Sequence, residues 1–251
     1  MPPTPTAYHR LNPLTKATIA TLGSLAAFVA GGYIGPLLIL AAMIAAAALG
    51  RVATQLVRLS LILTLPLAVS VVLVSALTRP GETVLFVIGP FDVTAEGVDF
   101  AAQTVVRLLA ISTSLGLFTL TTDPRAFVLD LERRGVPPRL AFVAVATVEA
   151  VPIMAERATT IAESQRARGL DTEGGVRGRL RGLLPIVGPM ILSSLTDVEE
   201  RSLALETRAF TRPGRRHLLW AMPDSSIQRV VRWLLLAGFV ALVAGRLAGW
   251  I

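Results

Sequence analysis

Long stretches without a charged side chain constrain this chain more than any other feature of its sequence. Residues 17–50 and 59–78 are uncharged, and residues 100–122 contain one charge, Arg107. One helical crossing of a bilayer needs about 20 mainly apolar residues. With 53% hydrophobic and 16% charged residues, the chain is too apolar for an ordinary soluble domain. The sequence predicts an all-α membrane protein with about five transmembrane helices plus long amphipathic cytoplasmic helices.

Turn-forming residues divide the apolar sequence into separate crossings. Residues 31–36, Gly-Gly-Tyr-Ile-Gly-Pro, favour a tight turn between two helices. The first crossing then begins near Leu11 and has Lys16 at the interface. Residues 79–99 hold an apolar run too short to cross, with Gly and Pro after it, and are predicted to form an external hairpin or cap. Further crossings are predicted at 59–78, 100–122 and 227–251, with Arg51 and Arg58 flanking the connection before the first of these.

The arginine distribution predicts how the chain is oriented. Residues 123–217 carry 15 Arg and 12 acidic residues, whereas residues 79–99 carry one Arg and four acidic residues. Because basic segments stay on the cytoplasmic side, the former belong inside and the latter outside. Membrane retention also explains the net charge of +7 without nucleic-acid binding. We predict an N-terminal transmembrane region (1–122), a cytoplasmic region (123–217) and a C-terminal transmembrane helix (218–251), in the cytoplasmic (inner) membrane.

Two apolar segments leave a seven-crossing alternative open. Residues 140–148 and 182–196 lie in the cytoplasmic region and contain no charge. If both crossed, the arginines between them would lie outside, which the positive-inside rule disfavours. We therefore favour long helices that lie along the membrane face, partly sunk in the interface.

The cytoplasmic region contains signals for three helices. Asp123 suits an N-cap with Pro124 at the first helical position, and Gly135 is expected to end that helix. The next helix is predicted from Pro137-Pro138 to Arg168, with a kink at Pro152. After a Gly-rich break at Gly174-Gly175 and Gly178, the third helix extends to about Phe210, with bends at Pro185 and Pro189.

Each of the two longer helices has an apolar face with residues three or four positions apart. On the second helix the face comprises Val151, Met154, Ala158 and Ile161, and on the third Leu184, Val187, Ile191, Leu195 and Val198.

Both of these helices end in a short arginine box. Residues 166–169 read Arg-Ala-Arg-Gly, and residues 206–210 read Glu-Thr-Arg-Ala-Phe. Arginine near a helix C-terminus complements the helix dipole, and glycine readily takes the left-handed cap. Arginine also forms bidentate contacts that lysine cannot copy. Each box is therefore either a docking group for a partner or simply a helix stop.

Several segments, in order along the chain, carry a resemblance to one family. They are Asn12-Pro13-Leu14-Thr15-Lys16, Leu120-Thr121-Thr122-Asp123-Pro124, Arg133-Arg134-Gly135-Val136-Pro137, Leu183-Leu184-Pro185, Ala167-Arg168-Gly169 and Ala204-Leu205-Glu206-Thr207-Arg208-Ala209-Phe210. Nearly the whole chain resembles the transmembrane T components of energy-coupling factor transporters, a family that includes the CbiQ-like cobalt permeases. The last segment departs from the family pattern, because Thr207 replaces the usual Ala and Ala209 the common Gly.

The resemblance implies a subunit that joins two ABC-type ATPase subunits to a membrane-embedded, substrate-binding S component. It implies that the long helices are coupling helices whose boxes dock on the ATPases through Ala167, Arg168, Gly169, Thr207, Arg208 and Ala209. Val151, Met154, Ala158, Ile161, Leu184, Val187, Ile191 and Leu195 then pack against the S component or against the chain's own spans. ATP is bound by the ATPases, and no cofactor or metal by this chain. The cargo is a vitamin or a transition-metal ion such as cobalt or nickel.

The sequence offers little support for rival functions. There is no Cys, no His-Glu-x-x-His and no Gly-x-Ser-x-Gly, and the only Lys is not in a Walker A motif, so neither an enzyme nor an ATPase is expected. The remaining alternative is a secondary transporter or channel with a cytoplasmic regulatory region. Such a protein needs ionisable groups at mid-membrane, for which only Arg107 is a candidate.

Overall fold

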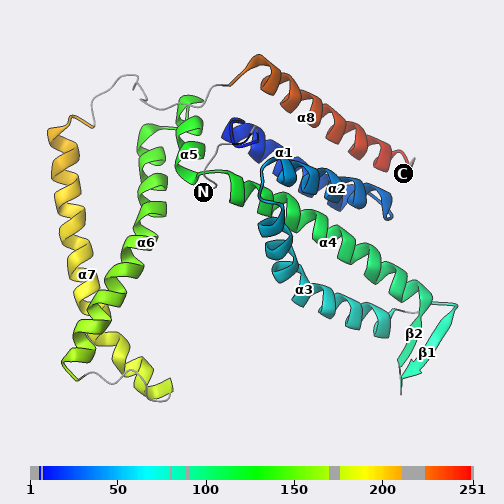
Figure 1. Cartoon of the computed structure of the whole chain (residues 1–251), viewed down its shortest axis with the longest axis horizontal. Helices are drawn as coiled ribbons and strands as arrows, with labels where there is room; N and C mark the ends of the chain where they lie inside the picture. Colours follow the sequence, from blue (N-terminus) through cyan, green and yellow to red (C-terminus); the bar gives the residue numbers. More distant parts are fainter. Residues whose placement is uncertain are drawn as a thin grey trace. The chain divides into compact units, whose positions relative to one another are not determined.

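The computed structural model describes residues 6, 8–79, 81–88, 91–169, 176–210 and 224–249. Within these residues the chain is almost entirely helical, which confirms the predicted fold class (Figure 1). The elements are α1 (Pro13–Val29), α2 (Ile34–Leu49), α3 (Ala53–Thr78), β1 (Val84–Ile88), β2 (Phe91–Thr94), α4 (Ala95–Thr121), α5 (Pro124–Arg133), α6 (Pro138–Ala167), α7 (Val176–Thr207) and α8 (Ser226–Leu247).

The chain forms two compact units. Unit 1 comprises residues 1–134 and 220–251, and unit 2 comprises residues 135–219. Unit 1 thus holds α1 to α5, the β-strands and α8, while unit 2 holds α6 and α7. The sequence groups α5 with the cytoplasmic helices, whereas by its contacts α5 belongs to unit 1, where it packs on α1.

Helix α4 is the centre of unit 1, because α1, α2 and α3 all pack against it. Small side chains allow this close approach. A Cβ atom added at Gly116 of α4 would lie 3.0 Å from Leu56 Cδ1, and one added at Gly23 of α1 would lie 3.1 Å from Ser114 Oγ. The outer faces of the same unit carry large exposed apolar side chains, among them Leu65 and Trp233. This arrangement, with small residues inside and large ones outside, suits a protein solvated by lipid.

Four of the described helices are long and apolar enough to cross a membrane, namely α3, α4, α6 and α8. Helices α1 and α2 are apolar but have only 17 and 16 residues, which corresponds to roughly 24–26 Å. Helix α6 meets the criteria because of its apolar first half, although the sequence predicts that it lies along the membrane face. The count of five crossings therefore stays a prediction.

Local sequence signals located several element boundaries correctly. Asp123 caps α5 by accepting a hydrogen bond from the Arg125 N–H at 3.0 Å, and Pro124 is the first helical residue, as predicted. Gly135 follows that helix with a left-handed φ of +113°. The hairpin predicted within residues 79–99 is present, since β1 and β2 pair antiparallel with Ile88 opposite Phe91. Its place outside the membrane stays a prediction.

Other boundaries differ from the sequence prediction. The connection before the third crossing is shorter than expected, because α3 already begins at Ala53 and includes Arg58. Gly178 was expected in a break, but α7 begins at Val176, so Gly178 is helical. A single helical Gly costs only about 1 kcal/mol relative to Ala, which neighbouring turns can offset. Gly174 and Gly175 lie outside the described residues.

Helices α6 and α7 of unit 2 pack against each other. Contacts at three levels hold them together: Phe142 and Phe210 form an edge-to-face pair with ring centroids 5.0 Å apart, Ser194 donates to Met154 Sδ at 3.6 Å, and Arg157 pairs with Asp197 at 2.6 Å. Figure 1 shows that α7 changes direction near its start, where Pro185 and Pro189 interrupt the hydrogen-bond ladder.

Candidate functional site

The two arginine boxes form the same structure at the ends of α6 and α7. Arg168 is the C-cap of α6, and Gly169 after it has φ +93°. Arg208 follows the last residue of α7, and Ala209 has φ +53°, the left-handed conformation usually taken by Gly. The main-chain N–H of Gly169 donates to the Arg166 carbonyl at 2.9 Å.

The second box makes the equivalent bond, since Ala209 donates to the Glu206 carbonyl at 2.9 Å. Phe210 then donates to the Leu205 carbonyl at 2.9 Å, and this pair of bonds defines a Schellman motif. The predicted helix stops are therefore real. Ala209 takes the left-handed conformation although it has a side chain.

The arginine side chains of both boxes are available to a partner. Arg168 and Arg208 are exposed, and neither makes a hydrogen bond or ion pair within the part of the chain that the structure describes. Their small neighbours Ala167, Gly169, Thr207 and Ala209 are exposed as well. A helix stop alone does not require an unpaired, exposed guanidinium group at the C-terminal end of both α6 and α7. The exposed side chains leave open the docking role that the family resemblance implies.

The apolar faces predicted for partner packing divide into two kinds. On α6, Met154 contacts Ser194 of α7, so this residue belongs to the packing inside unit 2. Ala158 and Ile161 are half-buried, while Val151 is 67% exposed.

On α7 the predicted face is exposed. Val187, Ile191 and Leu195 line an open groove of about 360 Å³ together with Met190, Ser194 and Val198. The side chain of Leu184 lies outside the described residues. An exposed apolar groove of this kind is typical of an interaction site.

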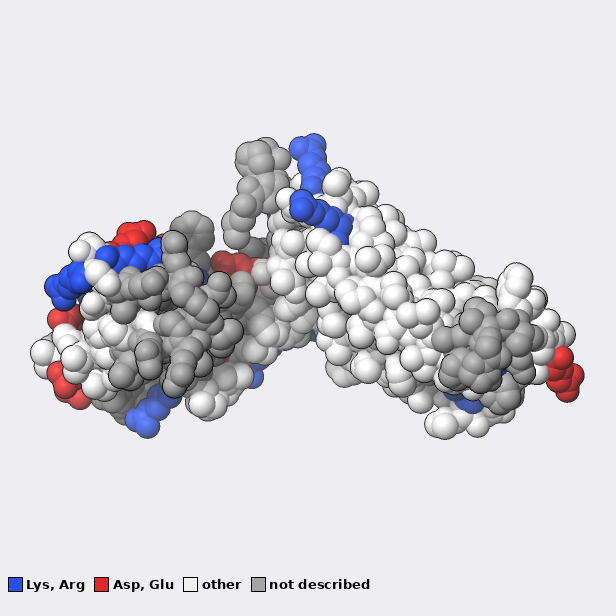
Figure 2. All heavy atoms as spheres, turned by 90° about the horizontal axis from the view of Figure 1, so that it is seen from below, with Lys and Arg blue, Asp and Glu red and all other residues white. Residues whose placement is uncertain are grey.

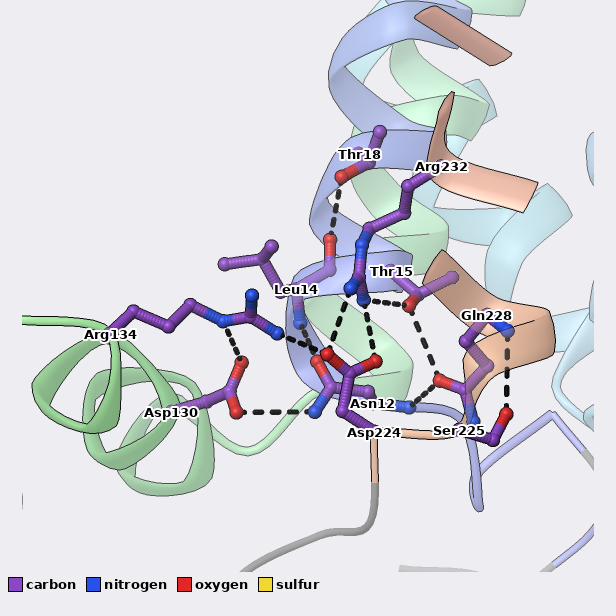
Figure 3. Close-up of polar contacts among 10 residues, drawn as sticks. All are labelled: Asn12, Leu14, Thr15, Thr18, Asp130, Arg134, Asp224, Ser225, Gln228 and Arg232. Atoms are coloured by element: carbon purple, nitrogen blue, oxygen red, sulfur yellow. Dashed lines mark hydrogen bonds and ion pairs between the residues drawn. The ribbon is translucent and has the colours of Figure 1, made fainter. Parts of the chain in front are cut away.

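A polar cluster in unit 1 was not predicted from the sequence (Figure 3). Asp224 binds both nitrogens of Arg232, with its Oδ1 3.0 Å from Nη1 and its Oδ2 2.8 Å from Nη2. Arg134 Nη2 also donates to Asp224 Oδ2, at 2.7 Å, and Arg134 Nε donates to Asp130 Oδ2 at 3.2 Å. Hydrogen bonds from Arg232, followed by those from Arg134, lower the pKa of the Asp224 carboxyl to about 2.

The same cluster extends into the N-terminal end of α1. Asn12 Nδ2 donates to Asp130 Oδ1 at 3.2 Å, and its Oδ1 caps α1 by accepting from the Leu14 N–H at 2.9 Å. Thr15 accepts a hydrogen bond from Arg232 at 2.9 Å. Asn12 and Thr15 belong to the Asn-Pro-Leu-Thr-Lys segment noted in the sequence, so the cluster gives that segment a structural role. The signal that could have located it is Arg232, a charge inside a membrane helix, which needs a partner.

The basic side chains of Lys16 in α1 and Arg107 in α4 donate hydrogen bonds to main-chain carbonyl groups of unit 1. Lys16, only 2% exposed, donates to the Thr121 carbonyl at 2.8 Å and to the His9 carbonyl at 3.2 Å, and so ties α1 to the end of α4. Arg107 donates to the Ala30 carbonyl at 3.3 Å, at the C-terminal end of α1. Among the described residues there is no group of three acidic, His or Cys side chains that could hold a metal ion. Figure 2 shows that unit 1 presents mainly uncharged side chains on this face.

Comparison with known proteins agrees with this architecture. The sequence model of the CbiQ family, described as cobalt transport protein, matches residues 5–218. The energy-coupling factor transporter transmembrane protein EcfT of Thermosediminibacter oceani is 30% identical over 213 residues, which cover 80% of this chain and 79% of that protein. EcfT of Limosilactobacillus fermentum is 26% identical over 95% of this chain and 94% of its own length.

These relatives and the membrane-spanning helices make the protein a multi-pass protein of the cytoplasmic membrane and a transport component. The match extends across α1 to α7, including both arginine boxes, and the longest alignments cover nearly the whole chain. The chain belongs to the CbiQ/EcfT family, the transmembrane T components of energy-coupling factor transporters.

Proposed function

We propose that this chain couples ATP hydrolysis by two ABC-type ATPase subunits to substrate release from a membrane-embedded S component. The observation that carries the proposal is the pair of exposed arginines, Arg168 and Arg208, each at the C-terminal end of a long helix of unit 2. Two equivalent boxes suit two related ATPase subunits, one box to each. The chain itself is non-catalytic, and ATP is bound by its partners.

The open groove on α7 supplies the second contact. Its lining is apolar, so we assign it, with Val151 on α6, to packing against the S component. The imported substrate is then a vitamin or a transition-metal ion such as cobalt or nickel, recognised by the S component rather than by this chain.

Substitution of the box arginines tests this function. A buried charge-assisted contact that loses one partner typically costs about 2–5 kcal/mol. Arg168→Ala and Arg208→Ala are therefore expected to insert at wild-type levels, yet to retain less ATPase subunit in a pull-down and to lose uptake. Arg→Lys at either position should also fail substantially, because an ammonium group cannot form the bidentate contact.

Arg201→Ala is the matched control, since Arg201 is an exposed arginine of α7 outside the box. It should behave as wild type. If both box variants retain ATPase subunits and transport normally, the boxes are helix stops only. Alanine is then nearly harmless, because only a helix-dipole contribution of about 0.3–1 kcal/mol is lost.

A further inference from the structure

The polar cluster lies where the chain leaves unit 1 and where it returns. Arg134 is the last residue of unit 1 before unit 2, and Asp224 comes shortly after unit 1 resumes at Trp220. Their side chains form a direct ion pair of 2.7 Å between positions 90 residues apart in sequence. One ion pair therefore joins the residue at which the chain leaves unit 1 to a residue just after the chain returns.

This ion pair is part of a network that joins three helices of unit 1. Figure 3 shows Asp130 from α5, Arg134 from the C-cap of α5 and Arg232 from α8, with Asp224 bound to both arginines. Asn12, at the start of α1, binds Asp130 through its side chain, while its main-chain N–H donates to Gln228 of α8 at 2.8 Å. A displacement of either connection between the units thus acts on α1, α5 and α8 together.

The cluster is built to resist deformation. Asp130 and Arg232 are buried, and so are Asn12 and Thr15 from α1. The charge-assisted contacts of Asp224 with buried Arg232 are therefore costly to break. Arg134 lies at the edge of the cluster, where its side chain is 37% exposed. Gly135 follows immediately, with φ +113° and no atom within 4 Å of the position of a Cβ. The hydrogen-bonded cluster is therefore followed directly by a glycine in a backbone conformation that other residues rarely adopt.

We propose that the cluster of Asp130, Arg134, Asp224 and Arg232 is the anchor through which movement of unit 2 is transmitted to the membrane helices. Asp224 is its central positioning residue, because it binds both arginines. The inference rests on the proposed function, in which the ATPases move unit 2. Without the cluster, movement of α6 and α7 would be taken up at the two connections between the units and would not reach α1, α5 and α8.

The test compares Asp224→Asn with wild type in the complete transporter, reconstituted in vesicles with its ATPase subunits and S component. Asn keeps the size of the side chain but cannot accept from both guanidinium groups as a carboxylate does. ATP hydrolysis should stay within about twofold of wild type, while substrate taken up per ATP hydrolysed should fall about fivefold or more. Asp99→Asn is the matched control, because Asp99 is a hydrogen-bonded carboxylate of the same unit outside the cluster, bound by Tyr33 and Gln103. It should leave the ratio unchanged.

A covalent replacement of the ion pair separates anchoring from folding. The chain has no Cys, so Arg134→Cys and Asp224→Cys can be combined and joined by a short bismaleimide, with cysteine-free partner subunits. The unlinked pair should be uncoupled, and linking should restore uptake per ATP. The same uptake per ATP before and after linking would overturn the proposal. So would Asp224→Asn complexes that form in smaller amounts but take up as much substrate per ATP as wild type. If the wild-type chain binds no ATPase subunit, the proposed function fails instead. Measuring this binding first therefore separates the two outcomes.

Discussion

The left-handed residue of each box gives a prediction that depends only on backbone physics. An L-residue with a side chain in the left-handed region costs roughly 1–2 kcal/mol, and Gly avoids that cost. Ala209 carries it at φ +53°, whereas Gly169 occupies the equivalent position at φ +93°. In the opposite direction, Gly loses more backbone entropy on folding than Ala, which destabilises the folded chain by roughly 0.5–1 kcal/mol. The difference between the two contributions is about 0.5–1 kcal/mol, so Ala209→Gly should stabilise the end of α7 by that amount and Gly169→Ala should destabilise the end of α6 by a similar amount.

Amide hydrogen exchange in detergent measures these local effects. The main-chain N–H groups of Ala209 and Phe210 are both hydrogen-bonded, so their protection reports opening of the cap. Ala209→Gly should raise protection about 2- to 5-fold, and Gly169→Ala should lower protection of the amide at position 169 by about the same factor. No atom lies within 4 Å of a Cβ built at Gly169, so a steric clash does not complicate the second variant. Lower protection in Ala209→Gly would refute the reasoning.

Three further predictions follow from the polar contacts and from the division of labour between subunits. Lys16→Met should lower the free energy of unfolding by about 1–3 kcal/mol per carbonyl left unpaired, seen as a lower thermal midpoint in detergent, while Ser24→Ala on the exposed part of α1 should not. Because the pKa of Asp224 is lowered to about 2 in the folded chain, below the unfolded value of about 3.9, its stabilisation is complete above about pH 5 and declines as the pH falls toward 2. The difference in thermal midpoint between wild type and Asp224→Asn should shrink over that range, and a difference that grew with acid would contradict this assignment. The purified chain alone should hydrolyse no ATP above background, with activity appearing only when ATPase subunits are added.

Much of the fold was predictable because it is determined by neighbouring residues. Asp123-Pro124 starts a helix and Gly135 ends it through bonds to residues no more than a few positions away. The uncharged runs likewise predict membrane helices from composition alone. The two cap motifs at Gly169 and Ala209 belong to the same class, since they require only the last turn of their own helix.

The polar cluster was not predictable in this way. The contacts that bring α1, α5 and α8 together join residues 90 to more than 200 positions apart, such as Asn12 with Gln228, and no local pattern specifies such pairs. Only the Asp130–Arg134 and Asp224–Arg232 pairs are close in sequence. The start of α3 was misplaced for a related reason. Arg58 was read as the end of a connection, but a helix tolerates a charge in its second turn when the side chain can reach the interface.

The central claim is that both boxes face the cytoplasm and dock on ATPase subunits. Single Cys substitutions at Ala167 and Thr207, each beside its box arginine, test both parts at once, because the chain has no other Cys. Both cysteines should react with a membrane-impermeant maleimide only from the cytoplasmic side, and assembly with the ATPase subunits should slow that reaction at least severalfold. Ser202→Cys, on the exposed surface of α7 outside the box, should stay reactive in the assembled complex. Reaction of either box from the outside, or equal reaction with and without ATPase subunits, would contradict the account.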